Sequence, residues 1–314
     1  MRALPLILSI LLLGAAPADV PIGQFREWLS FKKQPLDFAS GGVTVHVAAL
    51  PCPAKPVGDT SCRWDGFNNQ GSVTVSAPGI RPLTVTTDRQ SEYARIAIVR
   101  FEPHDPRPGV IVESQYGGSG GVLTVQLLLP VGDGYRAVPM VRRGGGILEG
   151  QIADYPIDRS GDGRIDLILE DAAFDTTFGC NACTPRPPRI FTVIGGVSTD
   201  VSDDPALRSV FATDMKRLAP RCFSGEPDRN GSCAAYVADA ARAGQFAAAW
   251  AAMLRHYEHG KDVRQFCDSH SSAEQHYACK PGHETRYRDF PESLRAFLIR
   301  AGYLQRRGAT VTAS

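Results

Sequence analysis

Residues 43–48 read Val-Thr-Val-His-Val-Ala, and this alternation of β-branched and other side chains is the pattern that decides the fold of residues 42–202. A period of two places every second side chain on one face of a strand. Comparable runs follow, separated by glycine and proline clusters, as is typical of antiparallel sheet proteins. They lie at residues 72–76, 95–99, 110–112, 122–127 and 189–194. We therefore predict a β-rich domain over residues 42–202, after an N-terminal segment (19–41) in which residues 19–33 form a short helix.

The pattern becomes helical after Ser202. Asp204-Pro205 is a capping residue followed by a first-turn proline, and predicts a helix through about Arg217. Two alanine-rich stretches, 233–242 and 245–257, flank Gly244 and predict an αα-hairpin. A last helix over residues 291–304 places four apolar side chains on one face, namely Leu294, Phe297, Leu298 and Tyr303. The chain is thus predicted to be α+β, with a small helical domain at residues 203–304 and a polar tail at 305–314.

The first 18 residues have the pattern of a cleavable export signal. Arg2 precedes an apolar stretch over residues 4–13, and Ala16-Pro17-Ala18 supplies a small-residue cleavage site. The apolar stretch is too short to span a bilayer as a helix. Without Arg2, 33 basic residues balance 33 acidic ones, which argues against a nucleic-acid partner. We expect a periplasmic or secreted protein with no membrane span after cleavage, and the sequence in this respect resembles an exported bacterial protein.

All eight cysteines follow the predicted signal, and an even number in an exported chain predicts disulfides. Spacing favours three local pairs, Cys52 with Cys62, Cys222 with Cys233, and Cys267 with Cys279. The remaining Cys180 and Cys183 form a C-x-x-C motif. The prolines that follow this motif prevent the helix that a thiol–disulfide exchange site needs, so we favour a structural disulfide there as well.

A predicted metal loop is the most specific motif of the chain. Residues 158–166 read Asp-Arg-Ser-Gly-Asp-Gly-Arg-Ile-Asp and place side-chain oxygens at Asp158, Ser160, Asp162 and Asp166 around Gly163. Calcium prefers six to eight oxygen ligands from a short loop, which this spacing can supply. A simple turn would explain Asp162-Gly163 but not the other acids.

Residues 157–169, together with the upstream run at 116–135, resemble the FG-GAP and VCBS repeats of integrin-like β-propellers. The resemblance covers about residues 95–200 and implies propeller-blade-like antiparallel sheets and a structural Ca²⁺. It also implies that Asp158, Ser160, Asp162 and Asp166 donate side-chain oxygens and that Arg164 donates its backbone carbonyl. Only this one loop carries the full ligand set. An EF-hand is disfavoured because its twelfth position is Leu169, where that motif needs a glutamate.

Three other motifs give weaker evidence for a functional site. Ser119 stands in a G-x-S-x-G pattern, but a strand-like run follows where a nucleophile elbow needs a helix. Cys267, Cys279 and three neighbouring histidines have zinc-ligand spacing, but an oxidising compartment favours the disulfide, so we do not expect Zn²⁺. The three histidines are His270, His276 and His283. His256 and His259 are placed at the end of a predicted helix, where they suit its dipole.

The leading functional hypothesis is a non-catalytic exported module that binds a protein or an envelope ligand and is stabilised by calcium and disulfides. The sequence identifies no catalytic residue and no organic cofactor. The alternative is an exported hydrolase whose carboxylates meet only in the fold, since paired carboxylates can perform acid–base chemistry. Its five candidate carboxylates are Glu113, Asp154, Glu170, Asp171 and Asp175.

Overall fold

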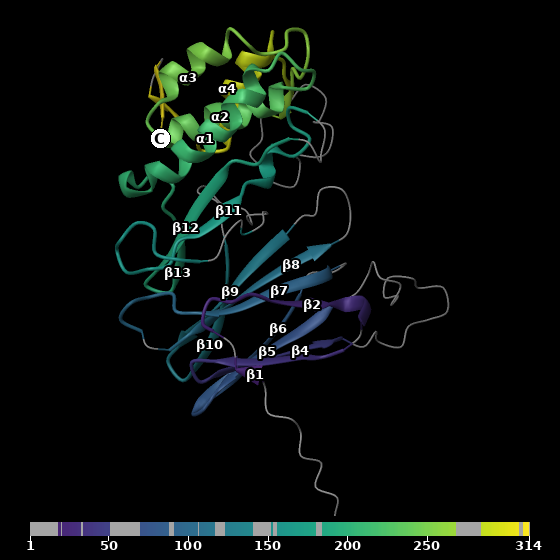
Figure 1. The fold of residues 1–314 in the computed structure, drawn as a ribbon, viewed down its shortest axis with the longest axis vertical. Helices are drawn as coiled ribbons and strands as arrows, with labels where there is room; N and C mark the ends of the chain where they lie inside the picture. Colours follow the sequence, from purple (N-terminus) through teal and green to yellow (C-terminus); the bar gives the residue numbers. More distant parts are fainter. Residues whose placement is uncertain are drawn as a thin grey trace, which may run out of the picture.

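The fold is known from a computed structural model of the 314-residue chain. The residues that it describes are 18–19, 21–32, 34–50, 70–87, 91–105, 107–116, 123–140, 152, 156–179, 184–267, 284–307 and 310–313. Three β-sheets and a group of helices lie in successive layers along the long axis of the molecule (Figure 1).

The first sheet has the strand order β1-β3-β4-β5-β6, and the central sheet has the order β10-β9-β8-β7-β2. Neighbours in both sheets are antiparallel, except that β1 runs parallel to β3. The strands of the first sheet are β1 (Ala18–Asp19), β3 (Leu36–Ser40), β4 (Val43–Ala49), β5 (Gly71–Ala77) and β6 (Ile80–Thr86). Those of the central sheet are β2 (Arg26–Leu29), β7 (Ser91–Val99), β8 (Gly109–Tyr116), β9 (Leu123–Val131) and β10 (Gly134–Pro139).

The central sheet is buried on both faces. Ile96, Ile98 and Val112 pack with side chains of the first sheet in one apolar cluster. Ala97 and Ile111, which alternate with them along β7 and β8, pack instead with a third, three-stranded sheet. The third sheet is antiparallel and consists of β11 (Leu167–Glu170), β12 (Pro188–Ile194) and β13 (Val197–Asp200). Its opposite face, which carries Ile168 and Ile190, contacts the helices.

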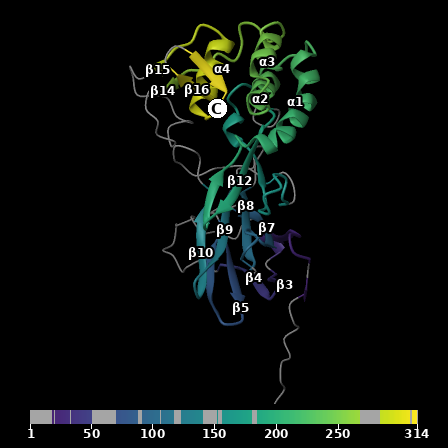
Figure 2. The same cartoon turned by 90° about the vertical axis from the view of Figure 1, so that its left-hand side faces the viewer.

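The helical part follows a 3-10 turn, η3 (Pro205–Leu207), in which the Asp204 side chain accepts a hydrogen bond from the Ala206 amide. Its four helices are α1 (Arg208–Phe223), α2 (Asn230–Arg242), α3 (Phe246–Met253) and α4 (Phe290–Arg300). Gly244 joins α2 to α3 at a φ of +74°, which favours glycine. Two short hairpins accompany the helices, β14 (Phe266–Cys267) with β15 (Glu284–Thr285), and β16 (Leu304–Arg307) with β17 (Thr310–Ala313). Figure 2 shows that this part lies at the end of the molecule beyond β12.

The predicted α+β order is confirmed, since β-sheets precede the helices. The described strands form antiparallel sheets stacked face to face, and these sheets do not close into a propeller ring. The central sheet is apolar on both faces and therefore needs a layer on either side, which the first and third sheets provide. The two predicted alanine-rich helices correspond to α2 and α3. Within the described residues, no helix is both long and apolar enough to cross a membrane.

Two segments differ from the predictions. Residues 19–33 contain β2 and a 3-10 turn, η1 (Ser30–Lys32), and not the short helix that we expected. The cause is Trp28, which is 2 % exposed in the core between the first two sheets, so tertiary burial decides its conformation. A Cβ on Gly71 would lie 2.8 Å from the Trp28 ring, which explains glycine at that position. Residues 304–313, predicted mostly as polar tail, contain the strands β16 and β17.

Candidate functional site

The aspartate loop (residues 158–166) lies between Ile157 and strand β11, and Ile157 forms an isolated β-bridge with Asp166 at the end of the loop. Asp158 accepts hydrogen bonds from the Gly161 amide at 2.6 Å and from the Gly163 amide at 2.8 Å. Asp166 accepts from the amides of Arg159 and Ser160, at 2.7 and 2.9 Å. The carboxylates thus hold the backbone of the loop that carries them, as acidic side chains commonly do in tight turns.

Asp162 is held by Arg164, whose amide and Nη1 donate to its two carboxylate oxygens at 2.8 and 2.9 Å. The Arg164 amide is the largest influence on the pKa of Asp162 and lowers it, so this carboxylate is ionised at neutral pH. Gly161 and Gly163 have φ values of +82° and +86°. A Cβ on Gly163 would also lie 3.2 Å from Pro103, so this position is closed to larger residues by conformation and by space.

The donor set of the loop suits a hard cation, because it consists of carboxylate, hydroxyl and carbonyl oxygens. Asp158 and Asp162 are exposed, whereas Asp166 is buried at the start of β11. Across the described residues, no three histidine, cysteine, aspartate or glutamate side chains lie close enough to form a metal centre. Calcium binding therefore requires the carboxylates of Asp158, Asp162 and Asp166 to converge from their present positions on the backbone amides.

A cleft of about 490 Å³ is lined by Glu102 and Asp105, which flank the Pro103 that approaches Gly163 of the aspartate loop. It is bounded by residues 101–107, by the turn between β9 and β10, and by the turn between β12 and β13. Phe101, Leu129 and Val193 supply apolar surface, and Arg107 and Arg136 supply charge. The volume is within the range that small-molecule sites occupy.

The polar groups of the cleft tie its walls together. Arg107 forms two hydrogen bonds of 3.0 Å to Asp105 and donates from Nη1 to the Gly132 carbonyl at 2.8 Å. The Arg107 guanidinium lowers the pKa of Asp105. Arg136 donates to the Gly196 carbonyl at 2.8 Å, and the Gly196 amide donates to Glu102 at 3.1 Å. All three walls are therefore connected, and the cleft is held open by its own hydrogen bonds.

The aspartate loop and the cleft share structural elements. Pro103 packs against Gly163, and Thr192 of β12 donates to the Ile165 carbonyl at 2.9 Å. Four large apolar side chains around these elements are exposed by 44–56 %, namely Val131, Ile157, Ile194 and Val197. Of these four, Val131 also lines the cleft.

Among the four described carboxylates of the hydrolase hypothesis, Glu170 and Asp175 lie near each other, since burial, and to a smaller extent the charge of Asp175, raises the pKa of Glu170. Glu113 lies between the central and third sheets, with Oε2 at 3.3 Å from Arg95 Nη1. Glu170 is on the other face of the third sheet, since it alternates with Leu169 along β11. Asp171 and Asp175 each pair with an arginine of their own, Arg189 and Arg186 respectively. Asp154 lies outside the described residues.

Glu113 nevertheless has an unusual protonation equilibrium. Burial raises its pKa from 4.5 to about 7, against the opposing influences of Arg95 and of the Ile152 amide, which donates to Oε1 at 2.7 Å. The folded chain thus retains a proton that the unfolded chain releases, and stability present below about pH 4.5 is lost as the pH rises to about 7.

In the wild type we expect the free energy of unfolding to fall by about 2–3 kcal/mol over this pH range. The fall should be absent in Glu113→Gln, because glutamine does not titrate. Urea unfolding of both proteins between about pH 5 and 8 measures it. The control is Glu27→Gln, the same change at an exposed site of β2, which should retain the wild-type pH dependence. If the free energy of unfolding of Glu113→Gln fell with pH as much as that of the wild type, the assignment of this proton to Glu113 would be wrong.

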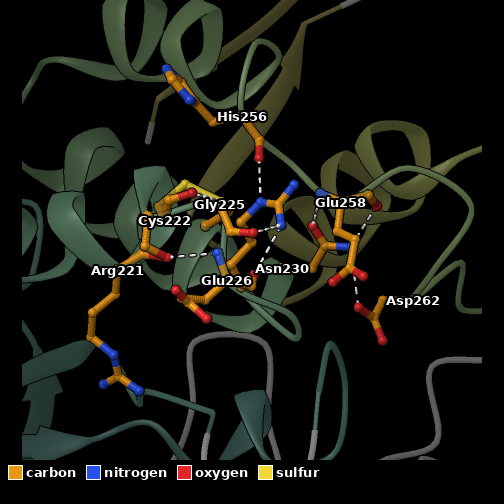
Figure 3. The surroundings of a disulfide bond; sticks show 11 residues. Arg221, Cys222, Gly225, Glu226, Asn230, His256, Glu258 and Asp262 are labelled. Atoms are coloured by element: carbon orange, nitrogen blue, oxygen red, sulfur yellow. Dashed lines mark hydrogen bonds between the residues drawn. A yellow bond between two sulfur atoms is a disulfide. The ribbon is translucent and has the colours of Figure 1, made fainter.

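Cys222 and Cys233 form a disulfide that joins the end of α1 to the start of α2, as their spacing predicted. Figure 3 shows the polar contacts around it. Arg229 donates to the carbonyls of His256 and Gly225 at 2.6 and 3.0 Å. Asn230 donates to the Glu258 carbonyl and to Asp262, at 3.0 and 3.1 Å. These contacts hold the loop before α2 against the segment after α3.

The other sequence predictions mostly lie outside the described residues. This applies to Cys52, Cys62, Ser119, Cys180, Cys183, His270, His276, Cys279 and His283, and to the side chain of Cys267. His256 and His259 are described and follow α3, which ends at Met253, and are not part of that helix. Their rings pack on Phe223 and Tyr257, with centroid separations of 4.7 and 4.2 Å.

Comparison with known proteins relates the helical part to a family. Residues 211–302 match the sll0997 C-terminal domain. The match extends from α1 to the end of α4. The chain is 28 % identical over 156 residues to "Probable thylakoid lumen protein sll0997" of Synechocystis, covering 47 % of this chain and 43 % of that protein. It is 25 % identical over 284 residues to "Uncharacterized protein y4bJ" of Sinorhizobium fredii, covering 86 % of this chain and 41 % of that protein.

Both relatives are therefore matched over less than half of their own length. No solved structure matches the chain.

Proposed function

We propose that this protein is an exported, calcium-stabilised binding module whose ligand surface is the cleft beside the aspartate loop. The observation that carries the proposal is the close approach of Gly163, in a loop with calcium-ligand spacing, to Pro103, which lies between the cleft residues Glu102 and Asp105. Ordering of the loop by an FG-GAP-like or VCBS-like calcium site would be transmitted to residues 101–107. The proposed donors are the side chains of Asp158, Ser160, Asp162 and Asp166 and the carbonyl of Arg164.

Export is supported by three observations of different kinds. The first 18 residues have the pattern of a signal, and a disulfide closes the αα contact at Cys222 and Cys233. Disulfides are typical of exported proteins. One relative is named a probable thylakoid lumen protein, and a lumen is reached by export. We propose the periplasm as the compartment, with the sheets, which include β2 and β3 from residues 26–40, as one domain and residues 203–304 as the other.

The test is calcium binding by the mature protein, measured by native mass and by thermal unfolding. We expect one bound Ca²⁺ and a stabilisation of about 2.7 kcal/mol at a free Ca²⁺ concentration 100 times the dissociation constant. Asp162→Asn should abolish the response and, in a chelator, should leave stability within about 0.5 kcal/mol of wild type, since Asp162 is exposed. The matched control is Asp133→Asn, at an aspartate whose side chain is 83 % exposed.

Hydrogen exchange in the same samples distinguishes the two parts of the proposal. Calcium should slow exchange in residues 158–166 and also at the amides of Phe101, Glu102, Asp105 and Arg107 of the cleft. Protection confined to the loop would reject the link to the cleft while retaining the metal site. No bound Ca²⁺ and no thermal shift at millimolar Ca²⁺ would reject the calcium site itself.

A further inference from the structure

Two carboxylates face each other between α1 and α2, far from the aspartate loop in the sequence. Asp239 of α2 is completely buried, and both of its carboxylate oxygens lack a hydrogen-bond donor. Asp214 of α1 lies within hydrogen-bonding distance of it. Asp214 Oδ1 accepts from Arg217 Nε at 2.7 Å, but its Oδ2 is also buried and has no donor. Three buried carboxylate oxygens, the two of Asp239 and Oδ2 of Asp214, therefore have no donor from the described chain.

The surroundings contain little positive charge to offset these carboxylates. Among the described residues, Arg217 of α1 is the cation whose charge lowers the pKa of Asp239. Glu170, from β11, adds negative charge next to Asp214, and Tyr303 contributes a buried phenol on the far side. Helix α3 has no ionisable side chain.

Three other arginines of the helical part have partners of their own. Arg242 of α2 pairs with Asp203. Arg295 and Arg300 of α4 lie over the rings of Trp250 and Phe266, at 4.8 and 5.5 Å.

We propose that Asp214 and Asp239 share one proton and form a carboxyl pair that makes the contact between α1 and α2 sensitive to pH. Two ionised carboxylates in a buried site repel strongly, whereas one proton between them converts the repulsion into an O–H···O hydrogen bond. Burial, followed by the charge of Asp214, raises the pKa of Asp239 well above its usual range, in agreement with this arrangement. The pair titrates as a unit, so the proton belongs to both residues.

The sign of the pH effect follows from proton linkage. The folded chain keeps a proton that the unfolded chain releases above about pH 3.9. The folding equilibrium constant therefore falls about tenfold for each pH unit, until the pair itself ionises and α1 and α2 repel each other. The Cys222–Cys233 disulfide still joins the two helices after ionisation. Loss of the proton is thus expected to loosen the packing of α1 against α2 reversibly, while the disulfide keeps the two helices linked.

The direct test is the pH titration of the aspartate carboxyl carbons of the mature wild-type protein by ¹³C NMR. We expect the Asp239 signal to titrate well above the ordinary aspartate value of about 3.9 and to shift together with that of Asp214. Titration of both signals in the ordinary range would overturn the proposal. This measurement needs no variant, so it remains decisive whatever the effect of substitutions on folding.

Urea unfolding of variants between about pH 5 and 8.5 provides the second test. Asp239→Asn should flatten the pH dependence by about one proton, which is tenfold per pH unit in the folding constant. Asp214→Asn should reduce the slope by less, because burial, the larger cause, still raises the pKa of Asp239 in that variant. Asp133→Asn, the same change at an aspartate whose side chain is 83 % exposed, is the matched control and should keep the wild-type slope. A wild-type slope in Asp239→Asn would reject proton sharing.

Discussion

Replacing Arg189 with methionine is expected to lower the free energy of unfolding by about 3–5 kcal/mol. Arg189 lies in β12, is 1 % exposed, and donates from Nε to Asp171 at 2.6 Å and from Nη1 to Asp200 at 3.2 Å. Methionine fills similar space but leaves Asp171 as a buried carboxylate without its cation. An uncompensated buried charge is among the most destabilising changes that a single substitution causes.

Arg189 also connects the third sheet to the helical part. Its Nη2 donates to the carbonyl of Ala301, which directly follows α4, and its guanidinium lies 4.8 Å from the centre of the Tyr303 ring. The Tyr303 hydroxyl in turn donates to Asp171 at 3.1 Å. We therefore expect Arg189→Met to destabilise both parts together, so that probes in the sheets and in the helices report the same loss.

Urea unfolding followed by far-UV circular dichroism and by tryptophan fluorescence measures this loss. Arg288→Met is the matched control, because the Arg288 side chain is 86 % exposed and its pair with Glu292 is a surface pair. Such pairs contribute about 0–1 kcal/mol. A loss in Arg189→Met no larger than that of the control would show that the cluster is not essential for stability.

The order of the elements could be predicted because its signals are local. Period-two runs marked the strands, and Asp204-Pro205 and Gly244 marked helix boundaries that the structure retains. The stacking of the sheets could not be predicted in this way. Residues 95–99 read Arg-Ile-Ala-Ile-Val, and only the third dimension shows that successive side chains of this run enter two different cores.

The candidate functional site was likewise predictable only where its residues are neighbours in the sequence. The spacing in residues 158–166 identified a set of oxygen donors because all of them lie in one short segment. The cleft was missed because its walls come from segments centred near residues 104, 131 and 195. The Arg189 cluster was missed for the same reason, since Asp171 lies 18 positions away and Ala301 lies 112 positions away. An arginine at the start of an apolar strand run was the one available signal, because a buried arginine needs a partner.

Phe174→Ala is expected to lower the free energy of unfolding by about 3–5 kcal/mol, the range for truncation of a buried phenylalanine. Phe174 ends the 3-10 turn η2 (Ala172–Phe174), directly after β11, and is completely buried. Its ring meets Phe297 of α4 and Tyr303 edge to face, with centroid separations of 4.9 and 5.6 Å. Edge-to-face pairs add to the free energy that burial of the ring area contributes.

The segment after β11 thus supplies core side chains to the helices. Phe178 is a second one, and its ring centroid lies 5.2 Å from that of Phe290 in α4. If the helices depend on this segment, Phe174→Ala should lower the unfolding midpoint of the helical part as much as that of the sheets. Phe31→Ala, at a side chain that is 61 % exposed, is the matched control and should change stability by less than about 0.5 kcal/mol. Independent unfolding of the two parts in Phe174→Ala, with the helical midpoint unchanged, would instead show that residues 203–304 form a core that does not need the segment after β11.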